Sequence, residues 1–229
     1  MKMAMSSVVA MAIAVATAGV SRADEVTASL EQGAFAVANI SVRGHAESVY
    51  AGAFQTTFGG GLAFESYCVD LDHNMSVSGN TYGATSGSLR SLGGSGRVGG
   101  AGVAWLVANI RPTTAAEYAG LQAAIWSTAY GNDTSIFSLA DSSGQHDIYT
   151  AMNADLAALG RADLSSVDGV LLTATSHPSG MYQDLAEVRY TGTGGGVNNG
   201  FSAVPEPSTV LMLGLGLAGA ATLRRRRAR

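Results

Sequence analysis

The chain has 229 residues, of which 47% are hydrophobic and 13% charged, and its formal net charge at pH 7 is −4. Its basic residues gather at the two ends. Residues 24–190 hold six arginines and no lysine, whereas every acidic residue except Glu206 lies there. The central part is therefore acidic, which argues against nucleic acid as a partner. Its length allows one domain with its own hydrophobic core.

Residues 1–23 have the features of a signal peptide. Lys2 supplies the positive start, residues 8–20 are apolar, and Ala23 ends a short run suited to signal-peptidase cleavage. We expect a signal helix here and cleavage before Asp24. The alternative is an uncleaved anchor, for which the apolar run is short.

The first half of the central part predicts strands. Residues 35–42, 49–58 and 62–71 combine β-branched and aromatic residues, and the glycines at 59–61 indicate a turn. In the third segment Cys68 and Asp70 share one face of the strand. Residues 80–100 are rich in Gly and Ser and predict a loop.

The second half predicts helices followed by strands. Residues 101–110, 115–130 and 141–160 show helical patterns, and Thr114 with Glu117 has the spacing of a capping box. Residues 167–175 predict a core strand, and residues 186–190 an edge strand. The expected class is α+β. A β-sandwich or barrel-like sheet from residues 30–72 and 165–190 carries the helical insertion of residues 100–160 on one side.

Gln122 is a polar residue on the apolar face of its predicted helix. At 100° per residue it lies at the centre of an apolar stripe that includes Tyr118, Ile125 and Trp126. A buried primary amide without partners costs roughly 1–3 kcal/mol. Gln122 must therefore have hydrogen-bond partners or be chemically altered.

Cys68 is the only cysteine, so the chain cannot form an internal disulfide. A lone cysteine in an exported protein is a buried apolar residue, a reactive thiol or an intermolecular link. The sequence leaves these three open.

Residues 67–70 read Tyr-Cys-Val-Asp and residues 121–126 read Leu-Gln-Ala-Ala-Ile-Trp. Together these two segments resemble the thioester domains of bacterial surface adhesins. The resemblance covers about residues 50–135 and implies an internal thioester between Cys68 and Gln122. Leu121 departs from the pattern, in which Thr precedes the Gln. The absence of lysine from the central part suits a domain that carries an amine-reactive acyl group.

A thioester needs shelter from water and a path for protons. Aromatic side chains near the two segments are candidates for the shield, and polar ones just after the cysteine for a proton relay. The candidates for shield or relay are Tyr67, Trp105, Tyr118, Trp126, Asp70, Asp72 and His73.

The last 26 residues form a tripartite tail after a Gly-rich linker, residues 191–203. Pro205, Glu206 and Pro207 precede an apolar segment, residues 208–223, which predicts a transmembrane helix, and an arginine cluster that stays cytoplasmic. Residues 204–229 resemble the PEP-CTERM sorting signal of Gram-negative bacteria. The resemblance implies transient anchoring in the inner membrane, an exosortase-type transpeptidase as partner, and delivery to the cell surface or extracellular matrix.

Three readings of the function follow. The first is an exported surface or matrix-associated protein, residues 24–190, whose thioester attaches covalently to an unknown surface or matrix nucleophile. It reacts once, so it is not an enzyme. The second is a non-reactive matrix protein with Cys68 as a free buried thiol. The third, a secreted hydrolase, lacks a recognisable catalytic motif. The four histidines lack metal-ligand spacing, so we expect neither metal nor cofactor.

Overall fold

The computed structural model describes residues 24–76, 79–94, 96–176 and 181–187, all within the compact unit Arg22–Ser202. The predicted signal peptide, linker and sorting tail lie outside the described residues. Within the described part of the chain, no helix is both long enough and apolar enough to cross a membrane.

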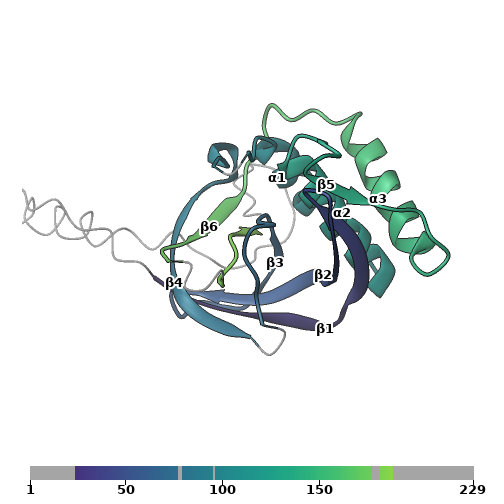
Figure 1. Ribbon diagram of the computed structural model, residues 1–229. Helices are drawn as coiled ribbons and strands as arrows, with labels where there is room; N and C mark the ends of the chain where they lie inside the picture. The colour runs from purple at the N-terminus through teal and green to yellow at the C-terminus, as the bar shows by residue number, and fades with distance from the viewer. Residues whose placement is uncertain (1–23, 77–78, 95, 177–180, 188–229) are drawn as a thin grey trace, which may run out of the picture. The chain divides into compact units, whose positions relative to one another are not determined.

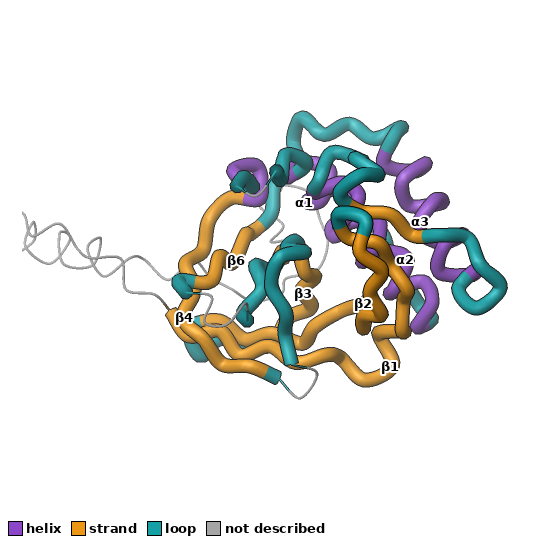
Figure 2. Tube along the Cα trace, viewed as in Figure 1, coloured by secondary structure: helices purple, strands orange, loops and turns teal. Residues whose placement is uncertain are grey.

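An antiparallel sheet curves around one core (Figure 2). Its order is β2-β3-β7-β6-β4-β1-β5, and β1 also pairs with β2, so six strands form a ring to which β5 is added. The members are β1 (Asp24–Val42), β2 (His45–Phe58), β3 (Phe64–Cys68), β4 (Asn80–Ser88), β5 (Phe137–Leu139), β6 (Val170–Ala174) and β7 (Leu185–Glu187).

The helices gather on one side of this sheet (Figure 1). They are the 3-10 turn η1 (Leu89–Ser91), α1 (Gly100–Asn109), α2 (Ala115–Ala129) and α3 (His146–Leu159). Thr114 caps α2, and the side chain of Glu117 accepts from the backbone of Thr114, which completes the predicted capping box. The fully buried Leu121 and Ile125 place α2 in the core of the domain.

The α+β class is confirmed, and the three helices lie close to their predicted positions. Two predictions are wrong. Residues 80–88 of the expected loop form β4, because their backbone pairs with β1 at one end and with β6 at the other. The expected edge strand is β7, which lies inside the sheet between β3 and β6 and is fully buried.

Gly52 marks the place where the long β1–β2 hairpin bends. Its φ is +153°, and the pairing register of β1 shifts between Leu30 and Phe35, directly across from it. A Cβ at Gly52 would lie 2.1 Å from the carbonyl oxygen of Ala34. Only glycine allows the two strands to approach this closely.

We therefore expect Gly52→Ala to lower the free energy of unfolding by about 3 kcal/mol or more, because the new Cβ meets backbone that cannot yield. Urea denaturation followed by circular dichroism measures this. Gly144→Ala is the matched control, since a Cβ there meets nothing within 4 Å. Equal stability of the two variants would contradict the close approach.

Candidate functional site

Cys68 lies where the sheet splits. β3 pairs with β2 only from Phe64 to Ser66, and with β7 at Tyr67 and Cys68. Continued register would set Gly52 opposite Cys68, but β2 turns away at that residue. The backbone of Cys68 is therefore left without a strand partner on the β2 side.

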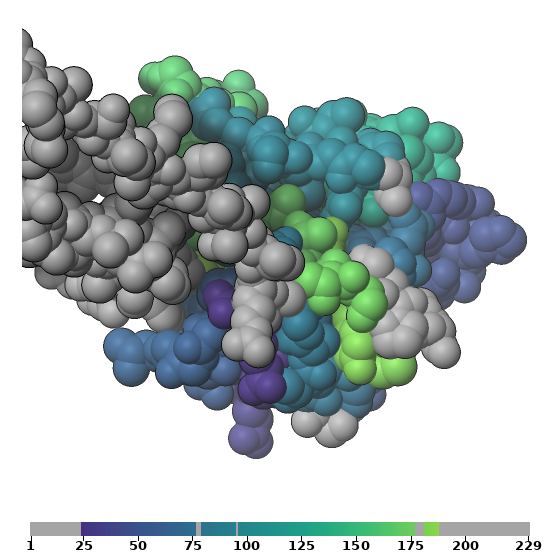
Figure 3. Space-filling view, turned by 90° about the vertical axis from the view of Figure 1, so that its left-hand side faces the viewer, coloured from purple at the N-terminus to yellow at the C-terminus, as the bar shows by residue number. Residues whose placement is uncertain are grey.

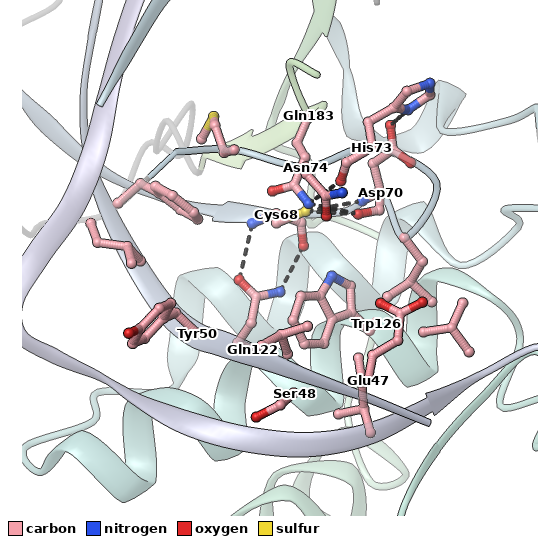
Figure 4. Close-up of a pocket in the computed structure, with 17 residues that line it drawn as sticks. Glu47, Ser48, Tyr50, Cys68, Asp70, His73, Asn74, Gln122, Trp126 and Gln183 are labelled. Atoms are coloured by element: carbon pink, nitrogen blue, oxygen red, sulfur yellow. Dashed lines mark hydrogen bonds and ion pairs between the residues drawn. The ribbon is translucent and has the colours of Figure 1, made fainter. Parts of the chain in front are cut away.

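The side chain of Gln122 occupies the position of the missing strand. The Cys68 N–H donates to Gln122 Oε1 at 3.0 Å, and Gln122 Nε2 donates to the Cys68 carbonyl oxygen at 2.8 Å (Figure 4). Both residues are 1% exposed. The amide that was anomalous in the sequence is thus fully paired, and its carboxamide is held against the residue that carries the thiol.

A second glutamine makes the same type of contact without a cysteine. Gln145 accepts from the N–H of Asn39 at 2.8 Å and donates to its carbonyl oxygen at 3.0 Å. β5 pairs with β1 only as far as Ile40, and the side chain of Gln145 takes the place of a strand partner for the next residue, Asn39. Gln122 does the same for Cys68 at the end of β3. The two-bond pairing is therefore a structural device of this fold, and the thiol is what distinguishes the Gln122 site.

The thiol of Cys68 is held by the backbone of Asp70. Its Sγ donates to the Asp70 carbonyl oxygen at 2.9 Å and accepts from the Asp70 N–H at 3.3 Å. Burial raises the pKa of the Cys68 thiol, and the Asp70 carboxylate raises it further. The group is consequently a protonated thiol at neutral pH and needs a proton acceptor before it can attack.

Asp70, which is buried, and His73, which is half-buried, form an acid–imidazole pair that lines the same cavity as this thiol. Asp70 Oδ2 lies 2.5 Å from His73 Nδ1, and Asp70 Oδ1 accepts from the Asp72 N–H at 2.8 Å. The side chain of Asp70 is 4% exposed and that of His73 23%. Gln183 fixes the turn between them by donating to the carbonyl oxygens of both residues.

Trp126 brings an unused donor to the site. Its side chain is 4% exposed, and its indole N–H has no hydrogen-bond partner in the described structure. The same indole opposes the rise in the pKa of Cys68 by favouring the thiolate. A buried donor of this kind is available for negative charge that develops on sulfur or on an adjacent oxygen.

These groups line one cavity of about 230 Å³. Its walls come from β1, β2, the end of β3, residues 70–75 and α2, with Gln183 closing one side. Cys68, Asp70, His73, Gln122 and Trp126, all singled out in the sequence, meet there.

Four predicted site residues do not line the cavity: Tyr67, Tyr118, Trp105, which is half-buried on α1, and Asp72, which pairs with Arg43. Tyr67 is fully buried, but its hydroxyl donates to Glu65 Oε1 at 2.8 Å. Tyr118 is half-buried on α2, and burial, followed by the nearby Glu65 carboxylate, raises the pKa of its hydroxyl. Both tyrosine rings therefore belong to the neighbourhood of Glu65 rather than to the thiol.

Sequence reasoning missed Asn74, Gln183 and the β2 residues Glu47 to Tyr50, which also line the cavity. Nothing in their local sequence marks them, because the sheet topology brings them to the cysteine. No group of three or more potential metal ligands occurs among the described residues.

The chain matches the model of the PEP-CTERM protein-sorting motif over residues 203–227, which confirms the resemblance of the tail. The motif implies export, membrane anchoring of the C-terminus before processing, and an exosortase as the processing partner. The predicted transmembrane helix and the Pro205–Glu206–Pro207 segment lie outside the described residues.

Two solved structures are similar to the chain. The N-terminal thioester domain of the fibronectin-binding protein SfbI from Streptococcus pyogenes has a TM-score of 0.42 and 14% identity, over 62% of this chain and 87% of that one. The N-terminal domain of the Streptococcus pyogenes pilus tip adhesin Cpa has a TM-score of 0.41 and 12% identity, over 62% and 83%. No curated protein sequence matches the chain.

The two amide contacts predict different losses. Gln122→Met leaves two buried backbone groups of Cys68 unpaired and should lower the free energy of unfolding by roughly 2–5 kcal/mol. Gln145→Met should cost less, about 1–3 kcal/mol, because Asn39 is exposed. Urea denaturation of both variants measures the difference. An unchanged stability of Gln122→Met would show that the carboxamide does not pair with Cys68 in solution.

Proposed function

We propose that this chain is an exported surface or matrix-associated protein in which Cys68 and Gln122 form an internal thioester. The sorting motif supports export of the protein and its placement at the cell surface or in the matrix. The observation that carries the chemistry is the two-bond contact that fixes the Gln122 carboxamide on the backbone of Cys68. Because the carboxamide is already held at this residue, the reaction between thiol and carboxamide does not require two separate groups to meet by diffusion.

In the proposed step the Cys68 sulfur attacks Cδ of Gln122. The S–H bond and the Cδ–Nε2 bond break, the S–Cδ bond forms, and the thiol proton leaves with Nε2 as part of one molecule of ammonia. No oxidant or reductant is needed. The product is an acyl group of higher energy than the amide, shielded inside the domain.

Three groups assist this step. The Cys68 N–H already donates to Oε1, where negative charge develops when sulfur adds to the carbonyl carbon. The unpartnered Trp126 indole N–H offers a second donor. The pair of Asp70 and His73 receives the thiol proton and returns it to the leaving nitrogen.

The finished thioester reacts once with a nucleophile of a partner. An amine or hydroxyl oxygen attacks Cδ of Gln122, the S–Cδ bond breaks, and Cys68 regains its proton. The partner is then joined to Gln122 through an amide or ester. Since Cys68 and Gln122 do not return to the starting state, the protein is consumed rather than catalytic.

The alternative function is that of a non-reactive matrix protein in which Cys68 stays a free thiol. The contact between Gln145 and Asn39 favours it, because the same pairing exists there without any chemistry. In that case Gln122 serves only to complete the sheet beside β3.

Intact mass separates the two functions. We expect the purified domain to be lighter than its encoded mass by one ammonia molecule, and to gain one methylamine when that amine is added. The matched controls are Cys68→Ser and Gln145→Met. Cys68→Ser should abolish the deficit, whereas Gln145→Met should keep it. A wild-type domain of full encoded mass that also ignores methylamine would establish the free-thiol alternative.

Loss of the proton relay should slow formation of the bond. After refolding from denaturant, Asp70→Asn should lose ammonia at least about tenfold more slowly than the wild type and with a flatter pH profile. Asp72→Asn is the control, because that carboxylate pairs with Arg43 at the surface. Equal rates and equal pH profiles for both variants would remove Asp70 from the mechanism.

A further inference from the structure

The outer half of β2 is a free strand edge next to the cavity. β2 pairs with β1 from His45 to Phe58, whereas β3 covers its other side only at Phe54, Gln55 and Thr56. Residues 45–48 and Tyr50 are exposed, and the rest of the described chain offers them no strand on that side. The blue end of the β1–β2 hairpin projects at the right of Figure 3.

The turn of the hairpin determines which backbone groups of β2 point outward. Arg43 and Gly44 have φ values of +49° and +81°, as in a type I′ turn, whose flanking residues Val42 and His45 bond to each other. The alternation of an antiparallel ladder then directs the N–H and C=O groups of residues 46, 48 and 50 away from β1.

The opposite end of β2 gives the same alternation. Cys68 directs its N–H and C=O toward Gln122, on the β2 side, so Ser66 also faces β2. Its partner Phe54 must then face β3, away from β1. Even-numbered residues of β2 therefore point outward at both ends of the strand.

This edge borders the cavity that contains the thiol. Glu47, Ser48, Val49 and Tyr50 line the cavity together with Cys68 and Gln122. In Figure 4 Ser48 lies below Gln122, on the side away from Cys68, while Tyr50 lies to the left of Gln122 and Glu47 to the lower right of Trp126. A chain lying along the edge would thus have a side chain within reach of the site.

We propose that the partner of this protein binds as an extended polypeptide strand added to β2 along residues 46–50. A row of backbone donors and acceptors is satisfied by another peptide backbone, whereas a polysaccharide cannot match its spacing and alternation. The charged residues that line the cavity are Glu47 and Asp70, with His73 and no arginine. The strand therefore carries a basic side chain that faces Glu47.

The strand contact rests on the sheet geometry and on the charge of Glu47, and only its role in delivering a nucleophile rests on the proposed thioester. The test consequently uses the full-length Cys68→Ala variant, in which no thioester can form. The probe is a capped seven-residue peptide of alternating valine and threonine with a central lysine, and the same peptide with a central glutamate is its control.

We expect the lysine peptide to slow amide hydrogen exchange at residues 46, 48 and 50 but not at residues 47 and 49, which already bond to β1. It should bind at least tenfold more tightly than the glutamate peptide. Ser48→Pro, which removes one outward N–H, should weaken binding at least tenfold, whereas Ser48→Ala should leave it within twofold. Thermal unfolding of both variants verifies that they fold.

Several results would overturn the proposal. One is unchanged exchange at residues 46, 48 and 50 in the presence of millimolar peptide. Another is equal peptide binding by Ser48→Pro and Ser48→Ala. A third is slow amide hydrogen exchange at these residues in the absence of peptide, combined with a dimer in analytical ultracentrifugation. A second copy of the chain would then occupy the edge. None of these outcomes depends on whether the wild type shows an ammonia deficit.

Discussion

The two hydrogen bonds between the Gln122 carboxamide and the backbone of Cys68 are the contact on which the site depends. They satisfy a buried amide, they complete β3 where β2 has turned away, and they hold the carboxamide against the backbone of the residue that carries the thiol. A single apolar substitution at residue 122 would leave two buried backbone groups unpaired. The same side chain therefore stabilises the sheet and supplies the carboxamide of the proposed thioester.

The split in the sheet has its own cause. At position 52 only glycine fits against the carbonyl oxygen of Ala34. The bend at Gly52 ends the pairing of β2 with β3 at Ser66, two residues before Cys68. The gap admits α2, whose buried face carries Gln122 and Trp126. Burial in this gap raises the pKa of the Cys68 thiol, which keeps it protonated at neutral pH. In the proposed mechanism, Asp70 or His73 must accept that proton before the sulfur attacks.

The cysteine, the glutamine and the helix that carries it were predictable because their signals are local. An amide on an apolar stripe and a capping box at Thr114 are both properties of one helix. β4 was not predictable, since it contains Asn80, Gly83, Ala84 and Gly87, which are of types depleted in strands, and it forms a strand only by pairing with β1 and β6. The contact between Gln145 and Asn39 and the role of Gly52 arise from packing across the chain, so no local pattern marks them.

The position of β7 has a mechanical consequence. The sorting motif implies that the protein is anchored in the membrane, before processing, through the chain that follows Glu187, the last residue of β7. Tension on that tether enters the domain through β7, and β7 is paired directly with Tyr67 and Cys68. β3, the strand that ends in the thiol, is therefore among the first to bear the load. If the proposed thioester joins a partner to Gln122, that partner would pull on α2. The load would cross the domain over a short distance, from one strand to the neighbouring helix, and leave most of the ring unstressed.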